Sequence, residues 1–482
     1  MQKLLKTHML TIITAFVCVA FILLRIPSLF EPHWYADEGI YAAVAYAMRH
    51  GQTLYTQIWD NKPPLIYYLY TAAGNIIGLK IFNLLAGLMS IIGLRALSGR
   101  VGLSTIGRIA TIIVATILLG TPLLEGNIAN AENFFVPLVI WGLYFGLSAK
   151  SWDMFFSGVL FATAFMFKFH PLFDFAALFF TTILVRHSIR ALLERWYAFV
   201  TGFLIPVIVL VLYLAVHGTF LQAMQIIFLG NIAYTQVYEW GLTSQPVKMG
   251  ILIAVITGIS ILHVRKRISP MTSFLGILLG FEYFAALLSG RQYTHYLLQT
   301  VPALSLIFGY AMEHIIHHMQ TIRNIIVISL LAVMLWAGMT VFDQGKGSDG
   351  SVNSIYYYSS FSQYIQGKRP YFLSDIETRI TKLKEYFSTK AQEKIVMYTD
   401  NPWYYVETGV VPPLSTVSAY HQNLRPHGES LFAGELGLYS PDIIIVDKEA
   451  HVSESVGEIL KKKYILDKED RWFAYYVQKQ VL

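Results

Sequence analysis

The stretch from Trp34 to Pro64, WYADEGIYAAVAYAMRHGQTLYTQIWDNKPP, is polar enough for water yet lies between apolar runs suited to lipid. Its first half places apolar residues at helical spacing after an Asp37-Glu38 pair, and Gly51 follows as a helix stop. Its second half ends in Asp60-Asn61-Lys62-Pro63-Pro64. Carboxylates at the start of a helix, a cation and a rigid turn at the edge of a membrane domain indicate chemistry on an anionic substrate carried by lipid.

The composition is that of a polytopic membrane protein. The chain has 482 residues, of which 55% are hydrophobic and 14% are charged, and its mean hydropathy is +0.51. Such values are typical of a protein with many membrane spans. The single cysteine, Cys18, excludes an internal disulfide and a cysteine metal cluster. The net charge of +6 is spread over short loops, so we expect no nucleic acid partner.

Apolar runs recur along the first 344 residues. The first run continues to about Phe30 and lacks a cleavage site, so we interpret it as a retained span and not as a signal peptide. The other predicted spans are 80–97, 104–122, 131–148, 153–167, 171–186, 196–216, 247–264, 271–289, 296–312 and 323–342. The sequence therefore predicts about eleven transmembrane helices, within a range of ten to twelve.

The basic residues give an independent test of these spans. They gather in alternate loops, at Arg95, Arg100, Arg108, Lys150, Arg186, Arg190, Arg195, Arg265, Lys266, Arg267 and Arg323. By the positive-inside rule those loops are cytoplasmic. The loops near Asp37, Glu132, Lys168, Tyr238 and Arg291, and everything after about residue 343, then lie on the other side. We expect a multi-pass protein of the bacterial cytoplasmic (inner) membrane whose active site and C-terminal domain are extracytoplasmic. An even number of spans would move that domain to the cytoplasm.

Near residue 345 the composition changes to that of a small soluble α/β domain. We divide the chain into a transmembrane domain, 1–344, whose first outer loop is 31–63, and a soluble domain, 345–482. Within the soluble domain the patterns predict helices at 376–387 and 455–464, and strands at 394–398, 442–446 and 472–478. The sequence Asp400-Asn401-Pro402-Trp403 is typical of a turn between a strand and a helix.

Several polar residues are candidates for a functional site, and each has a structural alternative. Asp37 could be a general base or a helix N-cap, with Glu38 beside it. Lys62 could bind phosphate or extend its amino group to the membrane interface. The pair Glu132-Asn133 could orient an acceptor or simply start a helix. The remaining candidates are Lys168 and Arg291 for phosphate, and Tyr41, His295 and Tyr296 for orienting an acceptor, with interfacial hydrogen bonding as the alternative for a lone histidine.

The order of motifs resembles a known family. A first span, the segment ADEGIYAAVAYAMRHGQ and then WDNKPPLIYYLY leading into the second span are similar to the polytopic lipid-dependent glycosyltransferases. This group includes the protein O-mannosyltransferases and the bacterial aminoarabinose transferase of lipid A, together called family-39-like transferases. The resemblance is strongest over residues 1–150, looser through AENFFVPL, FKFHPLF and RQYTHYLLQTVPALSL, and weak in the tail.

The resemblance implies a C-type glycosyltransferase fold and the inverting transfer of a sugar from a polyprenyl-phosphate donor to a hydroxyl of a lipid, glycan or protein acceptor. Asp37 matches the family's catalytic aspartate, and Lys62 matches the lysine of its Lys-Pro-Pro motif near the donor phosphate. The residue before that lysine is Asn61 here, where the aminoarabinose branch commonly has glutamate, so the metal requirement stays open: no cofactor is certain, and a divalent metal is an option. The alternatives are a ligase or polymerase of lipid-linked glycans, and a transporter or flippase of lipid-linked sugars. A transporter would carry ionisable residues at mid-membrane and internal repeats, which the sequence lacks.

Overall fold

Every apolar run that the sequence predicts within the described residues coincides with a helix. The computed structural model describes residues 2–185, 189–231, 244–290, 293–318, 354–368, 371, 375–390, 393–424 and 428–479. The helices on the predicted runs are α1 (Gln2–Arg25), α4 (Ile76–Arg100), α5 (Thr105–Gly120), α6 (Ala131–Gly146), α7 (Ser151–Phe165), α8 (Pro171–Val185), α9 (Ile189–Val216), α12 (Gln245–Val264), α13 (Pro270–Ala286) and α14 (Val301–His318). The predicted span 323–342 and the boundary near residue 345 lie outside the described residues.

Four of the described helical segments are long and apolar enough to cross a membrane: His8–Phe30, Ile76–Arg100, Leu192–Val216 and Gln245–Val264. Large apolar side chains on them are exposed in the folded chain, as for Phe16 at 73% and Val209 at 62%. An apolar surface of this kind is stable against lipid and not against water. The chain is a polytopic α-helical membrane protein, which confirms the prediction from composition.

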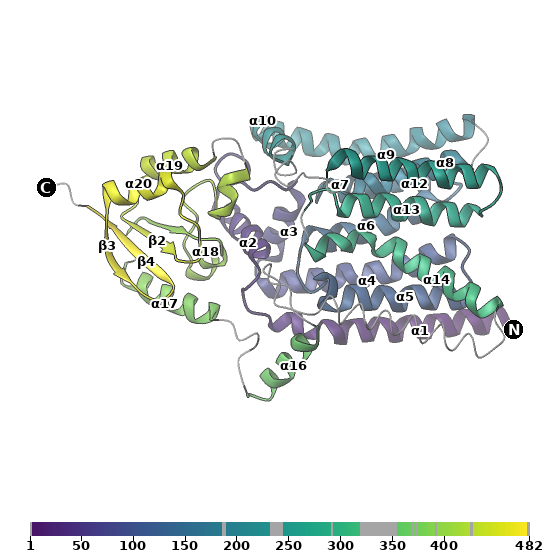
Figure 1. Cartoon of the computed structure of the whole chain (residues 1–482), viewed down its shortest axis with the longest axis horizontal. Helices are drawn as coiled ribbons and strands as arrows, with labels where there is room; N and C mark the ends of the chain where they lie inside the picture. The colour runs from purple at the N-terminus through teal and green to yellow at the C-terminus, as the bar shows by residue number, and fades with distance from the viewer. Residues whose placement is uncertain are drawn as a thin grey trace. The chain divides into compact units, whose positions relative to one another are not determined.

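The described chain forms two compact units, each built from segments that are distant in sequence. The first unit contains Met1–Phe30, Lys80–Leu210 and Tyr238–Ser362. In it, α1, α5, α6, α13 and α14 run roughly parallel (Figure 1). Helices α7 and α9 approach so closely that a Cβ on Gly158 would collide with the carbonyl oxygen of Phe199, and one on Gly202 with that of Phe155. Glycine at both positions lets the two backbones touch, as is usual where helices pack within a membrane.

The second unit contains Glu31–Leu79, Val211–Val237 and Gln363–Leu482. It combines α2 (Ala36–Arg49) and α3 (Leu65–Ala73) with a four-stranded sheet in the order β1-β2-β4-β3. The strands are β1 (Ile395–Tyr398), β2 (Ile443–Asp447), β3 (Tyr464–Glu469) and β4 (Phe473–Gln478). Strands β1 and β2 are parallel, and the other pairs are antiparallel. The three predicted strands are confirmed, whereas β3, YILDKE, was missed because it is an edge strand with five of its six residues exposed.

Helices cover both faces of this sheet (Figure 1). On one face, Val396 and Tyr398 of β1 pack in a core with Phe432 and Leu436 of α19 (Gly428–Tyr439) and with α20 (Glu454–Lys463). The other face is covered by α17 (Ile376–Ser388) and α18 (Trp403–Thr408). The alternation of β1 side chains between two apolar layers explains why its sequence is continuously hydrophobic. The shorter elements are η1 (Ile26–Phe30), η2 (Pro122–Leu124), α10 (Phe220–Met224), η3 (Gln225–Gly230), η5 (Thr294–Thr300), α16 (Ser354–Ile365) and η7 (Tyr420–Leu424).

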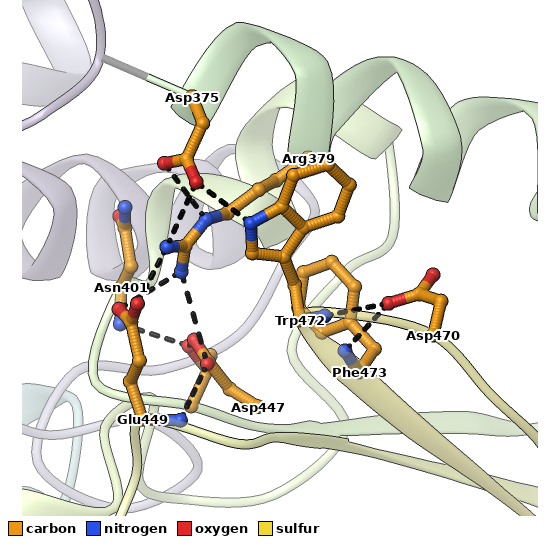
Figure 2. A network of polar contacts seen from close by, with 9 residues as sticks. Asp375, Arg379, Asn401, Asp447, Glu449, Asp470, Trp472 and Phe473 are labelled. Carbon is orange, nitrogen blue, oxygen red and sulfur yellow. Dashed lines mark hydrogen bonds and ion pairs between the residues drawn. The ribbon is translucent and has the colours of Figure 1, made fainter.

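A buried arginine ties α17 to the end of β2 (Figure 2). Arg379 donates to Glu449 at 2.5 Å and to Asp375 at 3.1 Å, and its guanidinium lies 4.0 Å from Asp447. The indole N–H of Trp472 donates to Asp375 at 2.7 Å. Three carboxylates surround the N–H donors of the Arg379 guanidinium, so the network holds α17 against the end of β2.

Candidate functional site

Helix α2 presents Asp37 and Glu38 in its first turn. Its N-cap is Tyr35, whose backbone is extended (φ −89°, ψ 122°), and no side-chain hydrogen bond caps the helix. The alternative in which Asp37 is the N-cap is therefore wrong. Asp37 is half-buried and Glu38 is buried. Both carboxyl groups lie in the first turn of α2, at the positive end of the helix dipole.

Lys62 is held from three directions. Its backbone N–H donates to the hydroxyl of Tyr67 at 3.2 Å, and its carbonyl accepts a hydrogen bond of 2.8 Å from the hydroxyl of Tyr55. Its ammonium donates to Asn61 at 3.0 Å and lies 5.6 Å from the ring centroid of Tyr41 on α2. The structure thus places Lys62, the predicted cation, beside α2, which carries the predicted base Asp37. The hydrogen bonds to Tyr55 and Tyr67 restrict the backbone of Lys62.

Asp60 is a site residue whose importance the sequence did not reveal. It is fully buried, it accepts a hydrogen bond of 2.6 Å from Tyr67, and it forms an ion pair of 3.0 Å with His421. Burial by itself would raise the pKa of Asp60, but the charge of Lys62, the imidazole of His421 beside it and the hydrogen bond from Tyr67 hold it well below its usual value. Asp60 therefore places a buried carboxylate next to the Lys-Pro-Pro segment.

Asn61, the residue before Lys62, pairs with a second asparagine. Its side chain donates to the Oδ1 of Asn231 at 3.3 Å, and Asn231 donates back to the Asn61 carbonyl at 2.7 Å. Two neutral amides therefore pair at this position. In the part of the chain that the structure describes, no group of three His, Cys, Asp or Glu side chains is placed to hold a metal ion.

The first unit contains a second polar cluster. Lys168, in the link between α7 and α8, forms an ion pair with Glu132 in the first turn of α6, and its ammonium lies 4.1 Å from the ring centroid of Tyr296. His295 forms an ion pair of 2.9 Å with Glu125. The structure thus brings together four residues that the sequence singled out, and it adds Glu125. Glu125 was not predicted because it lies in a loop with no motif around it.

The predicted site residue Asn133 holds a loop of the first unit. The side-chain amide of Asn133 donates to the carbonyls of Ile128 at 2.6 Å and Glu125 at 3.4 Å, so it holds the loop that precedes α6. This contact corresponds to the structural alternative of a helix-start residue, and an acceptor role for Asn133 stays a prediction. Arg291 lies outside the described residues.

Comparison with known proteins identifies the fold. No family model and no curated protein sequence matches the chain. Among solved structures, it matches the crystal structure of ArnT from Cupriavidus metallidurans, which was solved bound to undecaprenyl phosphate. The match covers 97% of this chain and 98% of that chain, with a TM-score of 0.58 and 12% sequence identity. The chain has the fold of ArnT.

The ArnT likeness extends over both the helical part and the α/β part, because nearly the whole of each chain is covered. It confirms the prediction of a polytopic C-type glycosyltransferase fold with a small C-terminal α/β domain. At 12% identity the likeness concerns the fold. The chemistry has to be argued from the side chains of this chain.

Proposed function

We propose that this chain is an inverting glycosyltransferase that moves a sugar from a polyprenyl-phosphate donor to a hydroxyl of a lipid, glycan or protein acceptor. The observation that supports it is the arrangement of Asp37 and Lys62 within one unit. The ammonium of Lys62 lies 5.6 Å from the ring of Tyr41, which follows Asp37 by about one turn of α2. The fold adds support, since ArnT was solved with undecaprenyl phosphate bound.

In the proposed reaction, the carboxylate of Asp37 takes the proton of the acceptor hydroxyl. The hydroxyl oxygen forms a bond to the anomeric carbon of the sugar from the face opposite the leaving group. The bond between that carbon and the phosphate oxygen breaks, and the polyprenyl phosphate leaves with the electron pair. Lys62 stabilises the negative charge that develops on the leaving phosphate. Attack from the opposite face inverts the configuration of the anomeric carbon.

The anchoring of Lys62 supports this role. A cation that is already in place when charge develops costs no reorganisation at the moment of reaction. The hydrogen bonds of its backbone to Tyr55 and Tyr67 restrict where its ammonium can reach. In the first unit, Lys168 forms an ion pair with Glu132, and its role as a phosphate-binding cation stays a prediction. The distribution of cations along the chain supports an extracytoplasmic site in a bacterial inner membrane.

The function is tested with the purified full-length protein in lipid. A polyprenyl-phosphate-linked sugar is the donor, and a bacterial membrane lipid extract supplies the acceptor. We expect release of polyprenyl phosphate and a product with inverted anomeric configuration. Asp37→Asn should lower the rate by about 10²- to 10⁴-fold while donor binding is kept, because an amide cannot accept the proton.

The matched control is Asp467→Asn, an exposed carboxylate on β3 that should leave the rate unchanged. A wild-type protein that binds the donor but never transfers its sugar would overturn the proposed function. Near-normal turnover by Asp37→Asn would remove Asp37 from the role of base.

A further inference from the structure

A histidine of the C-terminal segment reaches the Lys-Pro-Pro segment of the first loop. His421 in η7 lies 3.0 Å, Nδ1 to Oδ1, from Asp60. The side chain of His421 is 7% exposed and that of Asp60 is fully buried. A buried carboxylate is costly unless it is paired, so the contact is a required part of this region and not a surface ion pair.

Asp60 is linked to Lys62 through the side chain of Tyr67. Its other carboxylate oxygen accepts a hydrogen bond of 2.6 Å from the hydroxyl of Tyr67. The same hydroxyl oxygen accepts the backbone N–H of Lys62 at 3.2 Å. A chain of polar contacts therefore runs from His421 through Asp60 and Tyr67 to the backbone of the predicted phosphate-binding lysine.

The turn that follows β1 positions His421. Asp400 accepts hydrogen bonds from the Ser418 hydroxyl at 3.0 Å and from the backbone N–H of Tyr420, next to His421, at 2.6 Å. Three residues after Asp400, Trp403 donates its indole N–H to the carbonyl of Tyr35, immediately before α2, at 3.1 Å. The Asp400–Trp403 turn thus supports contacts to both segments of the first loop. Its predicted role as a strand-to-helix turn is confirmed, but that role explains neither contact.

We propose that His421 is a positioning residue for Lys62, and that the C-terminal α/β part completes the active site instead of being appended to it. This inference rests on the proposed function, because it assigns Lys62 to the donor phosphate. His421 does not touch substrate. It holds Asp60, which keeps the Tyr67 hydroxyl oriented toward the backbone of Lys62.

The test compares two variants of the full-length protein. His421→Phe keeps a ring of similar size but lacks the nitrogen that faces Asp60, whereas His421→Asn keeps a nitrogen donor near the position of Nδ1. We expect His421→Phe to lower kcat by about 10- to 100-fold, the usual effect of a displaced catalytic group. We expect His421→Asn to recover most of the loss. His451→Ala, an exposed histidine of the same unit, is the control and should have no effect.

A second readout separates this inference from the proposed function. Binding of polyprenyl monophosphate, without any sugar, should weaken in His421→Phe and stay normal in His421→Asn. If wild type binds this lipid phosphate but transfers no sugar, the proposed function fails while the positioning role is still measured by binding. If the two variants lose binding and kcat equally, or if neither loses any, the positioning role is overturned. Should His421→Phe not fold, Asp60→Asn replaces it, with the same loss expected and an unchanged kcat contradicting the inference.

Discussion

The indole of Trp403 lies directly beside Gly39, the residue after Glu38 on α2. A Cβ at Gly39 would lie 2.8 Å from the Cδ1 of Trp403 and 3.1 Å from its backbone nitrogen. Trp403 is 2% exposed and also donates its indole N–H to Tyr35. Glycine is therefore required at position 39 because the first turn of α18 packs against the turn that carries the predicted base.

Gly39→Ala should destabilise the protein by about 1–3 kcal/mol, because the added methyl group overpacks a site that has no space for it. The same change inside an open helix would stabilise it by up to about 1 kcal/mol. Gly457→Ala in α20, where nothing lies within 4 Å of the added Cβ, is the matched control. Unfolding in denaturant measures both variants. Equal stability of the two variants would mean that Trp403 can move away from α2.

Substitutions of Lys62 test whether its charge stabilises the leaving phosphate or its side chain only anchors the protein at the membrane interface. Lys62→Ala should lower turnover by about 10²- to 10³-fold, the usual effect of removing a preorganised group that stabilises developing charge. Lys62→Arg should recover part of this, because a planar guanidinium differs from a compact ammonium on a fixed backbone. The measurement is the transfer rate per folded molecule, with exposed Lys461→Ala as control. If Lys62 only anchors the chain at the interface, arginine should restore full activity and alanine should lower protein abundance alone.

A reporter enzyme fused after Leu482 should be active outside the cytoplasm. The predicted odd number of spans and the predicted alternation of basic loops both place the C-terminus on this side. A fusion after Lys150, in the predicted cytoplasmic loop between α6 and α7, is the control and should report the opposite side. Cytoplasmic activity of the Leu482 fusion would contradict the eleven-span topology.

Arg379→Met should destabilise the packing of α17 against the sheet. Arg379 is 8% exposed at its side chain and faces the buried Asp447, whose pKa is raised by burial. Loss of the cation leaves that carboxylate with hydrogen bonds from Thr399 and the Glu449 N–H but without the charge of Arg379, so we expect a local destabilisation of about 3 kcal/mol. Hydrogen exchange of the α17 amides measures it. Lys462→Met, which breaks an exposed pair with Glu458, is the control and should change exchange little. Equal exchange rates in the two variants would show that the Arg379 network is dispensable.

The sequence alone predicted the elements whose signal is local. The apolar runs predicted the described spans, since some twenty consecutive apolar residues have few stable alternatives to a membrane. Alternation and helical periodicity located β1, β2, β4, α17 and α20. The same local patterns missed β3, because an exposed edge strand carries little periodicity. They indicated the helix after the Asp400–Trp403 turn but gave it no bounds, because α18 has only six residues.

The sequence by itself also determined the chemistry that the first loop can offer, since the Asp-Glu pair opens a helix and Lys62 precedes two prolines. The tertiary structure decided which groups surround that chemistry. His421 lies 361 positions after Asp60 in the sequence, and Trp403 lies 364 positions after Gly39. Neither contact leaves a local pattern, because a lone histidine or tryptophan in a turn has many equally stable surroundings. The contact between His421 and Asp60 is favoured because Asp60 is buried. A carboxylate removed from water needs a polar partner, and that partner can come from any part of the chain.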